Sequence, residues 1–434
     1  MADGDSLSIR HGRLIDPANG IDGLLDLHIA DGRILAVGAA PPGFTPDQVL
    51  EARGQVVCPG FVDLCARLRE PGSEQTATIA SETRAAAASG VTALCCPPDT
   101  QPLIDTPAVA QLIRQTAQRH GLARVLPAAA LTQGLAGTQI SEMAALKRAG
   151  CPVMSHADRP VVNTLVLRRA LEYAATFDLT VFLHPEDPYL RAGGCVHEGR
   201  ISTRLGLPGI PEAAETVAVA RDLALAEQTG ARVHFRGLST ARATEMLREA
   251  QERGIAATAD VSAAQLVLTE DDVGRFDSNC HLIPPLRTAR DRAALRAAVA
   301  NGVIGAICSD HQPHEADAKL APFPATAPGI SALETLLPLA LRLVDEDVAA
   351  LPVVIARLTE GPAQILGKPL LGRLDEGHSA DICVFDPEAC WTLDPTRLVS
   401  RGRNTPFAGQ VLKGQVTWTL LAGRVVYSRP LDNP

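Results

Sequence analysis

Eight apolar strand-like runs, each followed by a helix-like segment, alternate between residues 56 and 345. Most of the runs have consecutive apolar residues rather than an alternating pattern, which is typical of parallel strands buried on both faces. Eight such units predict a closed (β/α)8 TIM barrel of the α/β class. The predicted strands are residues 56–64, 91–98, 124–131, 152–157, 179–186, 232–239, 255–262 and 303–310.

The segments between these runs carry start and stop signals for helices. In the first segment Thr78 is a candidate N-cap, and Gly90 follows the last helical residue, as is common at helix ends. The predicted helices are residues 78–89, 107–120, 140–149, 163–176, 211–229, 240–253, 288–300 and 331–345.

Both ends of the chain differ from the barrel. Residues 7–56 and 372–428 carry short β patterns, among them IADGRILAVG and LLAGRVVY, which are typical of hairpins turned at glycine. Because chain termini often lie close together, we expect one small β-sandwich domain built from both ends. The predicted division is residues 1–56 for the N-terminal part of the sandwich, 57–368 for the barrel and 369–434 for the C-terminal part.

The composition fits a globular protein with a large barrel. Of the 434 residues 46% are hydrophobic and 21% charged, and the formal net charge is −9, which argues against nucleic acid or an anionic membrane as a partner. The sequence has no apolar run of about 18 residues, and its start, MADGDSLSIR, lacks the features of a secretory signal. Its ten cysteines form no C-x-x-C pair, so we expect buried thiols in a reducing cytoplasm.

The first barrel strand runs into FVDLCARLREPG (61–72), which has the frame of the metal-binding pattern Asp-x-His-x-His without its histidines. In a (β/α)8 barrel the functional groups lie at the C-terminal ends of the strands. The residues that the sequence places around this mouth are Cys65, Arg67, Arg69, Asp99, His156, His184, Gly237 and Asp310.

Longer phrases point to a known family. They include HPEDP (184–188), HEGRISTRLGLPGIPEAAE (197–215), VHFRGLSTARA (233–243), PPLRT (284–288), SDHQPH (309–314) and NTPFAG (404–409), in order along the chain. With these phrases the chain resembles dihydroorotases of the amidohydrolase superfamily from end to end. The resemblance implies one or two zinc ions at the barrel mouth and a zinc-activated water that attacks the ring amide of dihydroorotate. It also implies an aspartate at the end of strand eight, here Asp310, as the proton shuttle.

The zinc ligands implied by the resemblance are incomplete. The two histidines after the first strand are replaced by Cys65, which can bind zinc as a thiolate, and by Arg67, whose guanidinium has no free lone pair. The strand-four carboxylate falls in the phrase SHAD (155–158), where His156 cannot bridge two metals as a carboxylate does. We therefore expect no bound metal or other cofactor. The positions divide into the remnants Cys65, His184 and Asp310 and the losses Arg67, Ala157 and Gly237.

The residues that would hold the substrate carboxylate are also altered. By resemblance, Arg69 and His314 match the family's pocket, whereas Asp99 and Ile283 replace two asparagines. An aspartate near a carboxylate lowers affinity unless a cation compensates its charge. We therefore expect an ion pair between Arg67 and Asp99 in this remnant of the substrate pocket, and no catalytic residue in use.

The surviving polar residues also have a structural interpretation. His184 and Asp310 would hydrogen-bond to each other or to the backbone at the strand ends, since buried polar groups are nearly always paired. His311 and His314 are as consistent with the capping of loops as with a ligand role.

Three functions stay open on the sequence. The resemblance implies a non-catalytic dihydroorotase-like subunit that scaffolds aspartate transcarbamoylase in pyrimidine biosynthesis, in a hetero-dodecamer with six copies of each chain; a homodimer is also open. The first alternative is a divergent dihydroorotase or other cyclic amidase with one zinc on Cys65, His184 and Asp310. The second is a sensor that binds a small anion through Arg69 and His314.

Overall fold

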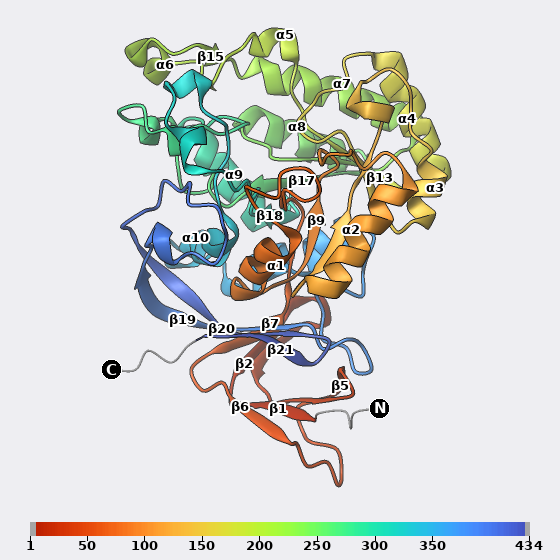
Figure 1. Cartoon of the computed structure of the whole chain (residues 1–434), viewed down its shortest axis with the longest axis vertical. Helices are drawn as coiled ribbons and strands as arrows, with labels where there is room; N and C mark the ends of the chain where they lie inside the picture. Colours follow the sequence, from red (N-terminus) through yellow and green to blue (C-terminus); the bar gives the residue numbers. More distant parts are fainter. Residues whose placement is uncertain (1–5, 430–434) are drawn as a thin grey trace.

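The predicted barrel is present in the computed structural model, which describes residues 6–429 (Figure 1). The barrel strands are β8 (Phe61–Asp63), β9 (Val91–Cys96), β10 (Arg124–Pro127), β11 (Ala129–Ala130), β12 (Val153–Ser155), β13 (Thr180–Leu183), β16 (Val233–Phe235), β17 (Ala257–Ser262) and β18 (Ala306–Cys308). They pair in parallel in the orders β10-β9-β8 and β11-β12-β13-β16-β17-β18. Because β10 leads directly into β11, these two sets of strands form one continuous barrel wall.

Hydrogen bonds between the ends of β18 and β8 close this wall into a barrel. The amide of His311 donates to the carbonyl of Cys65 (3.2 Å), and the amide of Arg67 donates to the carbonyl of His311 (2.9 Å). The buried carboxylate of Asp63 accepts a hydrogen bond from the amide of Ser309 (3.0 Å). The fold is therefore the predicted (β/α)8 barrel, with the residues that follow β18 beside those that follow β8.

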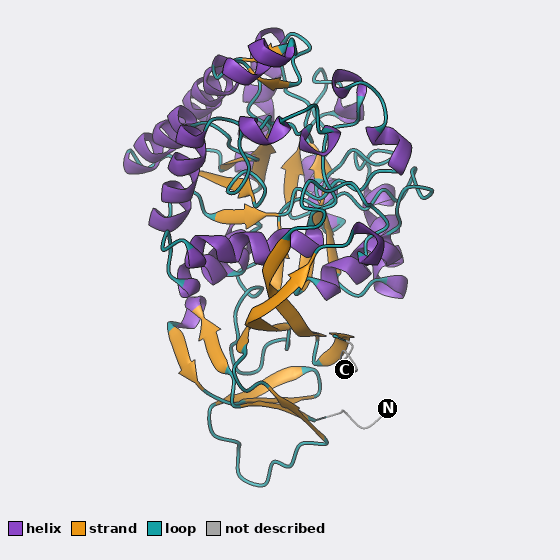
Figure 2. Cartoon of the chain, turned by 90° about the vertical axis from the view of Figure 1, so that its left-hand side faces the viewer, coloured by secondary structure: helices purple, strands orange, loops and turns teal. Residues whose placement is uncertain are grey.

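Helices surround the barrel strands (Figure 2). The predicted cap of the first helix is confirmed, because the hydroxyl of Thr78 accepts a hydrogen bond from the amide of Ser81 (3.1 Å). Two short helices near the end of the barrel, α11 and α12, were not predicted. The helices after the barrel strands are α1 (Ile79–Ala88), α2 (Pro107–His120), α3 (Met143–Arg148), α4 (Thr164–Thr176), α7 (Ala213–Thr229), α8 (Ala241–Glu252), α9 (Ala289–Asn301), α10 (Leu336–Asp345), α11 (Leu351–Leu358) and α12 (Glu360–Ile365).

The long connection between β13 and α7 folds into a small cap above the barrel (Figure 1). It contains α5 (Pro188–Arg191), α6 (Arg200–Leu205) and the parallel strand pair β14 (Val196–His197) and β15 (Gly209–Ile210). These elements are two to six residues long. Hydrophobic periodicity does not identify elements of this length, so the sequence analysis left the connection without structure.

Strands from both ends of the chain form the small domain below the barrel, as predicted. Its two sheets have the orders β5-β4-β1-β6 and β21-β20-β19-β7-β2-β3, and apolar side chains from both sheets share one core. Its strands are β1 (Leu7–Arg10), β2 (Arg13–Asp16), β3 (Ile21–Leu24), β4 (Leu27–Ala30), β5 (Arg33–Val37), β6 (Gln48–Glu51), β7 (Val56–Pro59), β19 (Ile382–Thr392), β20 (Val411–Leu421) and β21 (Arg424–Ser428).

The single strand predicted over residues 56–64 is in fact two strands. β7 pairs with β2 and β19 in the sandwich, whereas β8 belongs to the barrel. Gly60 joins them where the backbone lies against Thr92, since a Cβ at Gly60 would come within 2.2 Å of its hydroxyl. The sandwich therefore reaches residue 59, a few residues beyond the predicted division at 56. None of the helices within residues 6–429 combines the length and apolar character needed to cross a membrane.

Candidate functional site

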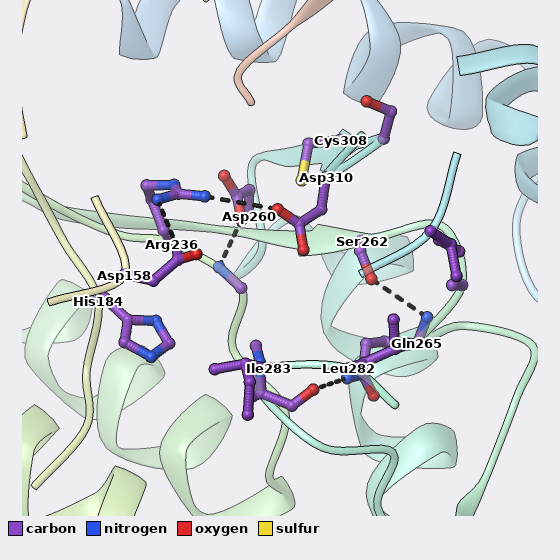
Figure 3. A pocket seen from close by; sticks show the side chains of 15 residues that line it. Asp158, His184, Arg236, Asp260, Ser262, Gln265, Leu282, Ile283, Cys308 and Asp310 are labelled. Carbon is purple, nitrogen blue, oxygen red and sulfur yellow. Dashed lines mark hydrogen bonds and ion pairs between the residues drawn. The ribbon is translucent and has the colours of Figure 1, made fainter. Parts of the chain in front are cut away.

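Five charged side chains meet at the barrel mouth, each delivered by the segment just after a barrel strand. Arg67 follows β8, Asp99 follows β9, Asp158 follows β12, Arg236 follows β16 and Asp310 follows β18. Figure 3 shows three of them, Asp158, Arg236 and Asp310, turned toward one another. Because the C-terminal ends of parallel barrel strands meet at one end of the barrel, residues far apart in the sequence form a single group. We call these five residues the mouth cluster.

Arg67 is the centre of the mouth cluster, and only 5% of its side chain is exposed. Each nitrogen of its guanidinium faces a different carboxylate. Nε is 2.8 Å from Asp99, Nη2 is 2.5 Å from Asp158, and Nη1 is 3.8 Å from Asp310. The predicted ion pair between Arg67 and Asp99 is thus confirmed. A planar guanidinium, with donors in fixed directions, suits carboxylates arranged around it in this way.

Arg236 is a second buried arginine of the mouth cluster, and the sequence analysis missed it. Its Nη1 donates to Asp158 (3.1 Å), and its Nη2 lies 2.6 Å from the sulfur of Cys65 and 3.5 Å from Asp310. The lost histidine position was placed at Gly237, where the chain adopts a φ of +65°. The charged side chain after β16 is therefore Arg236, the residue before this glycine.

Asp158 is the other member of the mouth cluster that the sequence analysis did not single out. The chain turns at Ala157, which has a φ of +51° and packs with Ala130, Leu135 and Leu103. His156 points elsewhere: its Nε2 is 2.8 Å from the hydroxyl of Thr132, and its Nδ1 is 2.7 Å from the carbonyl of Arg159. Both nitrogens of His156 are therefore engaged away from the mouth, and it is not a ligand there.

The charges of the mouth cluster compensate one another. Burial opposes the ionisation of Asp158, but Arg67 and Arg236 outweigh it and hold the pKa of this carboxyl well below its usual range. Burial also opposes the charge of Arg67, but Asp158 and Asp99 outweigh it and raise the pKa of the guanidinium. Asp310 differs, because burial and the neighbouring Asp158 raise its pKa. When the pH falls, Asp310 is the carboxylate of the two that takes up a proton first.

Cys65 and His184, two of the three remnant ligands, also lie at the mouth. Burial raises the pKa of the Cys65 thiol well above its ordinary value, so the residue is a neutral thiol, 3.4 Å from Asp310. The Nε2 of His184 lies 3.7 Å from Glu186 and, among the described residues, has no hydrogen-bond partner. Of the two predicted possibilities, a bond between His184 and Asp310 or bonds to the backbone, the first is not found among the described residues, where Asp310 lies against Cys65 instead.

The mouth cluster does not fit the zinc ion that the resemblance implies. Two unit charges about 4 Å apart interact by about 4 kcal/mol at an effective dielectric constant of about 20, so each nearby guanidinium would repel a dication by about 8 kcal/mol. The carboxylates that could bind a metal are engaged by Arg67 and Arg236 instead. Over residues 6–429, no group of three or more His, Cys, Asp or Glu side chains is arranged to hold a metal ion.

The remnant of the substrate pocket is engaged by the protein's own backbone. The Nε of Arg69 donates to the carbonyl of Pro313 (3.0 Å), and the Nε2 of His314 lies 2.8 Å from the carbonyl of Pro328. Burial and the charge of Arg67 lower the pKa of Arg69 to about 10. Burial and the charge of Arg69 lower the pKa of His314 to about 4. His314 is therefore neutral at pH 7 and holds a loop, which agrees with its structural interpretation.

A small cavity borders the mouth cluster on the side of Asp158, Arg236 and Asp310, and Figure 3 shows the side chains that line it. The cavity there measures about 20 Å³ and is bordered by His184, Gln265, Ile283 and Pro284, among others. A cavity of this size holds about one water molecule. Ile283, which stands where the family pattern has an asparagine, is 7% exposed and makes this wall apolar. A second opening at the mouth, of about 90 Å³, is lined by Arg67, Arg69 and Asp99, among others. The side on which the resemblance places the substrate carboxylate is therefore the roomier one.

Known proteins are similar to this chain along nearly its whole length. A family model described as dihydro-orotase-like matches residues 54–243. A relative named dihydroorotase-like protein, from Pseudomonas putida, is 51% identical over 422 residues, which is 97% of this chain and 99% of the relative. The chain belongs to the dihydroorotase family. A protein named dihydroorotase, from Anaeromyxobacter dehalogenans, is 45% identical over 425 residues, or 98% of each chain.

Solved structures confirm the architecture. L-hydantoinase (dihydropyrimidinase) from Arthrobacter aurescens superimposes with a TM-score of 0.88 at 22% identity, covering 98% of this chain and 96% of that one. At this identity the likeness establishes the fold alone. The chain therefore shares its overall fold with this L-hydantoinase along nearly its whole length.

Glu215, at the start of α7, is the centre of a buried network formed by the phrases that carry the family resemblance. Its carboxylate accepts hydrogen bonds from the amides of Ser239 (3.1 Å) and Thr240 (3.0 Å) and from both of their hydroxyls. Arg287 donates to the Ser239 hydroxyl (3.1 Å) and to the carbonyl of Ile210 (2.8 Å). The Glu215 network thus joins three loops of the barrel without taking part in the mouth cluster.

Glu82, on α1, is the centre of a second buried network. It accepts hydrogen bonds from the Nε2 of His311 (2.8 Å) and the hydroxyl of Ser400 (2.6 Å). The Nδ1 of His311 in turn accepts from the amide of Ala332 (3.0 Å). His311 therefore holds a loop, as its structural interpretation predicts. The Glu82 network ties the barrel to the segment that leads back into the sandwich.

Proposed function

We propose that this chain is a non-catalytic member of the dihydroorotase family that scaffolds aspartate transcarbamoylase in pyrimidine biosynthesis. The observation that carries the proposal is the mouth cluster, in which Arg67 and Arg236 engage the carboxylates at the position where the family resemblance implies zinc. Without a metal, none of the side chains at the mouth offers a nucleophile comparable to zinc-bound hydroxide.

The proposed partner is the catalytic chain of aspartate transcarbamoylase, in a hetero-dodecamer with six copies of each chain in the cytoplasm. This assignment rests on the resemblance to inactive dihydroorotase-like subunits. The well-formed Glu82 and Glu215 networks support it, because they keep the barrel and its loops ordered independently of any chemistry at the mouth. A homodimer of this chain would be compatible with the same assembly.

Reconstitution tests this proposal. The purified chain is mixed with the aspartate transcarbamoylase catalytic chain from the same source, and particle mass and carbamoyl transfer are measured with and without it. We expect a mixed particle and a higher rate of carbamoyl transfer. An unchanged mass together with an unchanged rate would refute the scaffold function.

The same preparations test the catalytic alternative. Hydrolysis of dihydroorotate is followed after metal analysis and after incubation with zinc, and we expect neither bound zinc nor turnover. Stoichiometric zinc with turnover that is lost in a Cys65→Ala variant would instead establish a divergent enzyme that uses Cys65, His184 and Asp310.

A further inference from the structure

The mouth cluster joins strand ends that come from all around the barrel. Arg67 connects the segment after β8 to those after β9 and β12 through two close ion pairs, and Arg236 connects the segment after β16 to the one after β12. Both guanidiniums also lie within 4 Å of Asp310, after β18. A metal ion at a barrel mouth makes links of the same kind, from one central cation to ligands on several strands.

The charge count at the mouth is already close to balance. Three carboxylates, Asp99, Asp158 and Asp310, face two guanidiniums. A dication added to this arrangement would bring its positive charge next to two fixed ones. If Arg67 were absent, however, the three carboxylates, Arg236 and one divalent cation would sum to zero.

From this geometry we infer that Arg67 is the resident cation of the site: its guanidinium occupies a latent divalent-cation site and takes over the structural role of the metal. The occupant is part of the chain, so the native protein needs no metal to hold the mouth together. Removal of the Arg67 side chain leaves three carboxylates around a vacancy. The guanidinium holds them apart in the native chain, where they form no metal-binding group among the described residues. A hard divalent cation such as Mn²⁺, which carboxylate ligands suit, would draw them together. The inference concerns the mouth alone and stands whether or not the chain assembles with a partner.

Thermal unfolding of the full-length chain tests the inference. The native protein is measured after treatment with EDTA, with added MnCl₂, and with guanidinium chloride at millimolar concentration against NaCl at equal ionic strength. We expect its midpoint to be the same in all four conditions. For Arg67→Ala we expect a midpoint lowered by several degrees, which rises again with Mn²⁺ and with guanidinium, because a ligand that binds only the folded state stabilises it. Calorimetric titration should find one Mn²⁺ per chain.

Two controls separate a specific site from general ion binding. The double variant Arg67→Ala/Asp158→Asn removes a proposed ligand and should lose the Mn²⁺ response. Arg124→Ala breaks an ion pair with a single carboxylate, Asp381 (2.9 Å), outside the mouth cluster, and its midpoint should not respond to either ion.

Arg67→Gln, which keeps a long polar side chain without the charge, is measured in parallel in case Arg67→Ala fails to fold. The inference is overturned if the purified native chain carries stoichiometric metal or is destabilised by EDTA. It is also overturned if Mn²⁺ and guanidinium both fail to raise the unfolding midpoint of Arg67→Ala and of Arg67→Gln. These results leave the partner proposal untouched, since the reconstitution measures assembly and not metal content.

Discussion

The mouth cluster and the Glu215 network lie in the same barrel but relate to the family pattern in opposite ways. The Glu215 network is built from phrases that match the dihydroorotase pattern, and its contacts are hydrogen bonds between loops. The mouth cluster keeps Asp310 from that pattern, but it has Arg67 where the resemblance implies a zinc ligand, and it consists of ion pairs. The residues that hold the loops of the family fold are therefore separate from the residues at the position of its metal site. The phrases that identify the family here stabilise loops.

The largest expected effect comes from breaking the Glu215 network. Glu215→Ala leaves two buried amides and two hydroxyls without their acceptor, and we expect the free energy of unfolding to fall by about 4 kcal/mol. Urea denaturation followed by circular dichroism measures it. Glu227→Ala, at an exposed position on the same helix, is the matched control and should change the stability by less than about 0.5 kcal/mol. Equal effects of the two variants would mean that the network does not support the fold.

The Glu82 network should be visible in the pH dependence of stability. Burial would raise the pKa of Glu82, but hydrogen bonds from His311 and Ser400 outweigh it and lower that pKa to about 2. Since the folded pKa lies below the ordinary value, the stabilisation is present above about pH 4.5 and is lost as the pH falls toward 2. A difference of about two to three pKa units corresponds to about 3 kcal/mol.

Glu82→Gln is the variant that isolates this contribution. It removes the charge and keeps the shape, so its unfolding free energy should be lower than that of the native chain at pH 7, and the two should converge near pH 2 to 3. Urea titrations at a series of pH values give both curves. Parallel curves over that range would show that Glu82 has an ordinary pKa in the folded state.

The sequence predicted most of the architecture but only part of the mouth. The barrel strands and most helices were predictable because their apolar patterns are long and regular, whereas the cap from α5 to β15 is made of elements too short to show a period. Arg67 and Asp99 were paired by their opposite charges alone. Asp158 and Arg236 were missed because each lies one residue from the expected ligand position. The backbone has a positive φ at both expected positions, Ala157 and Gly237. The hydrophobic pattern of the sequence does not indicate such a local change in backbone direction. A count of charges at the strand ends was the available signal, since carboxylates compensate the charge of a buried arginine.

The smallest expected effect comes from restoring one family residue at the mouth. Asp99→Asn puts back the amide of the substrate pocket and removes one carboxylate from Arg67. Asp99 is partly exposed, with 27% of its side chain accessible, and an asparagine oxygen can still accept a hydrogen bond from Arg67. We therefore expect a loss of only about 1 kcal/mol in unfolding free energy. Because Asp158 still holds Arg67 in place, and backbone carbonyls still engage Arg69 and His314, dihydroorotate should not raise the unfolding midpoint of this variant. A midpoint that rises with dihydroorotate would show that a single substitution reopens the pocket, and that the mouth, unlike the Glu215 network, is held shut by Asp99 alone.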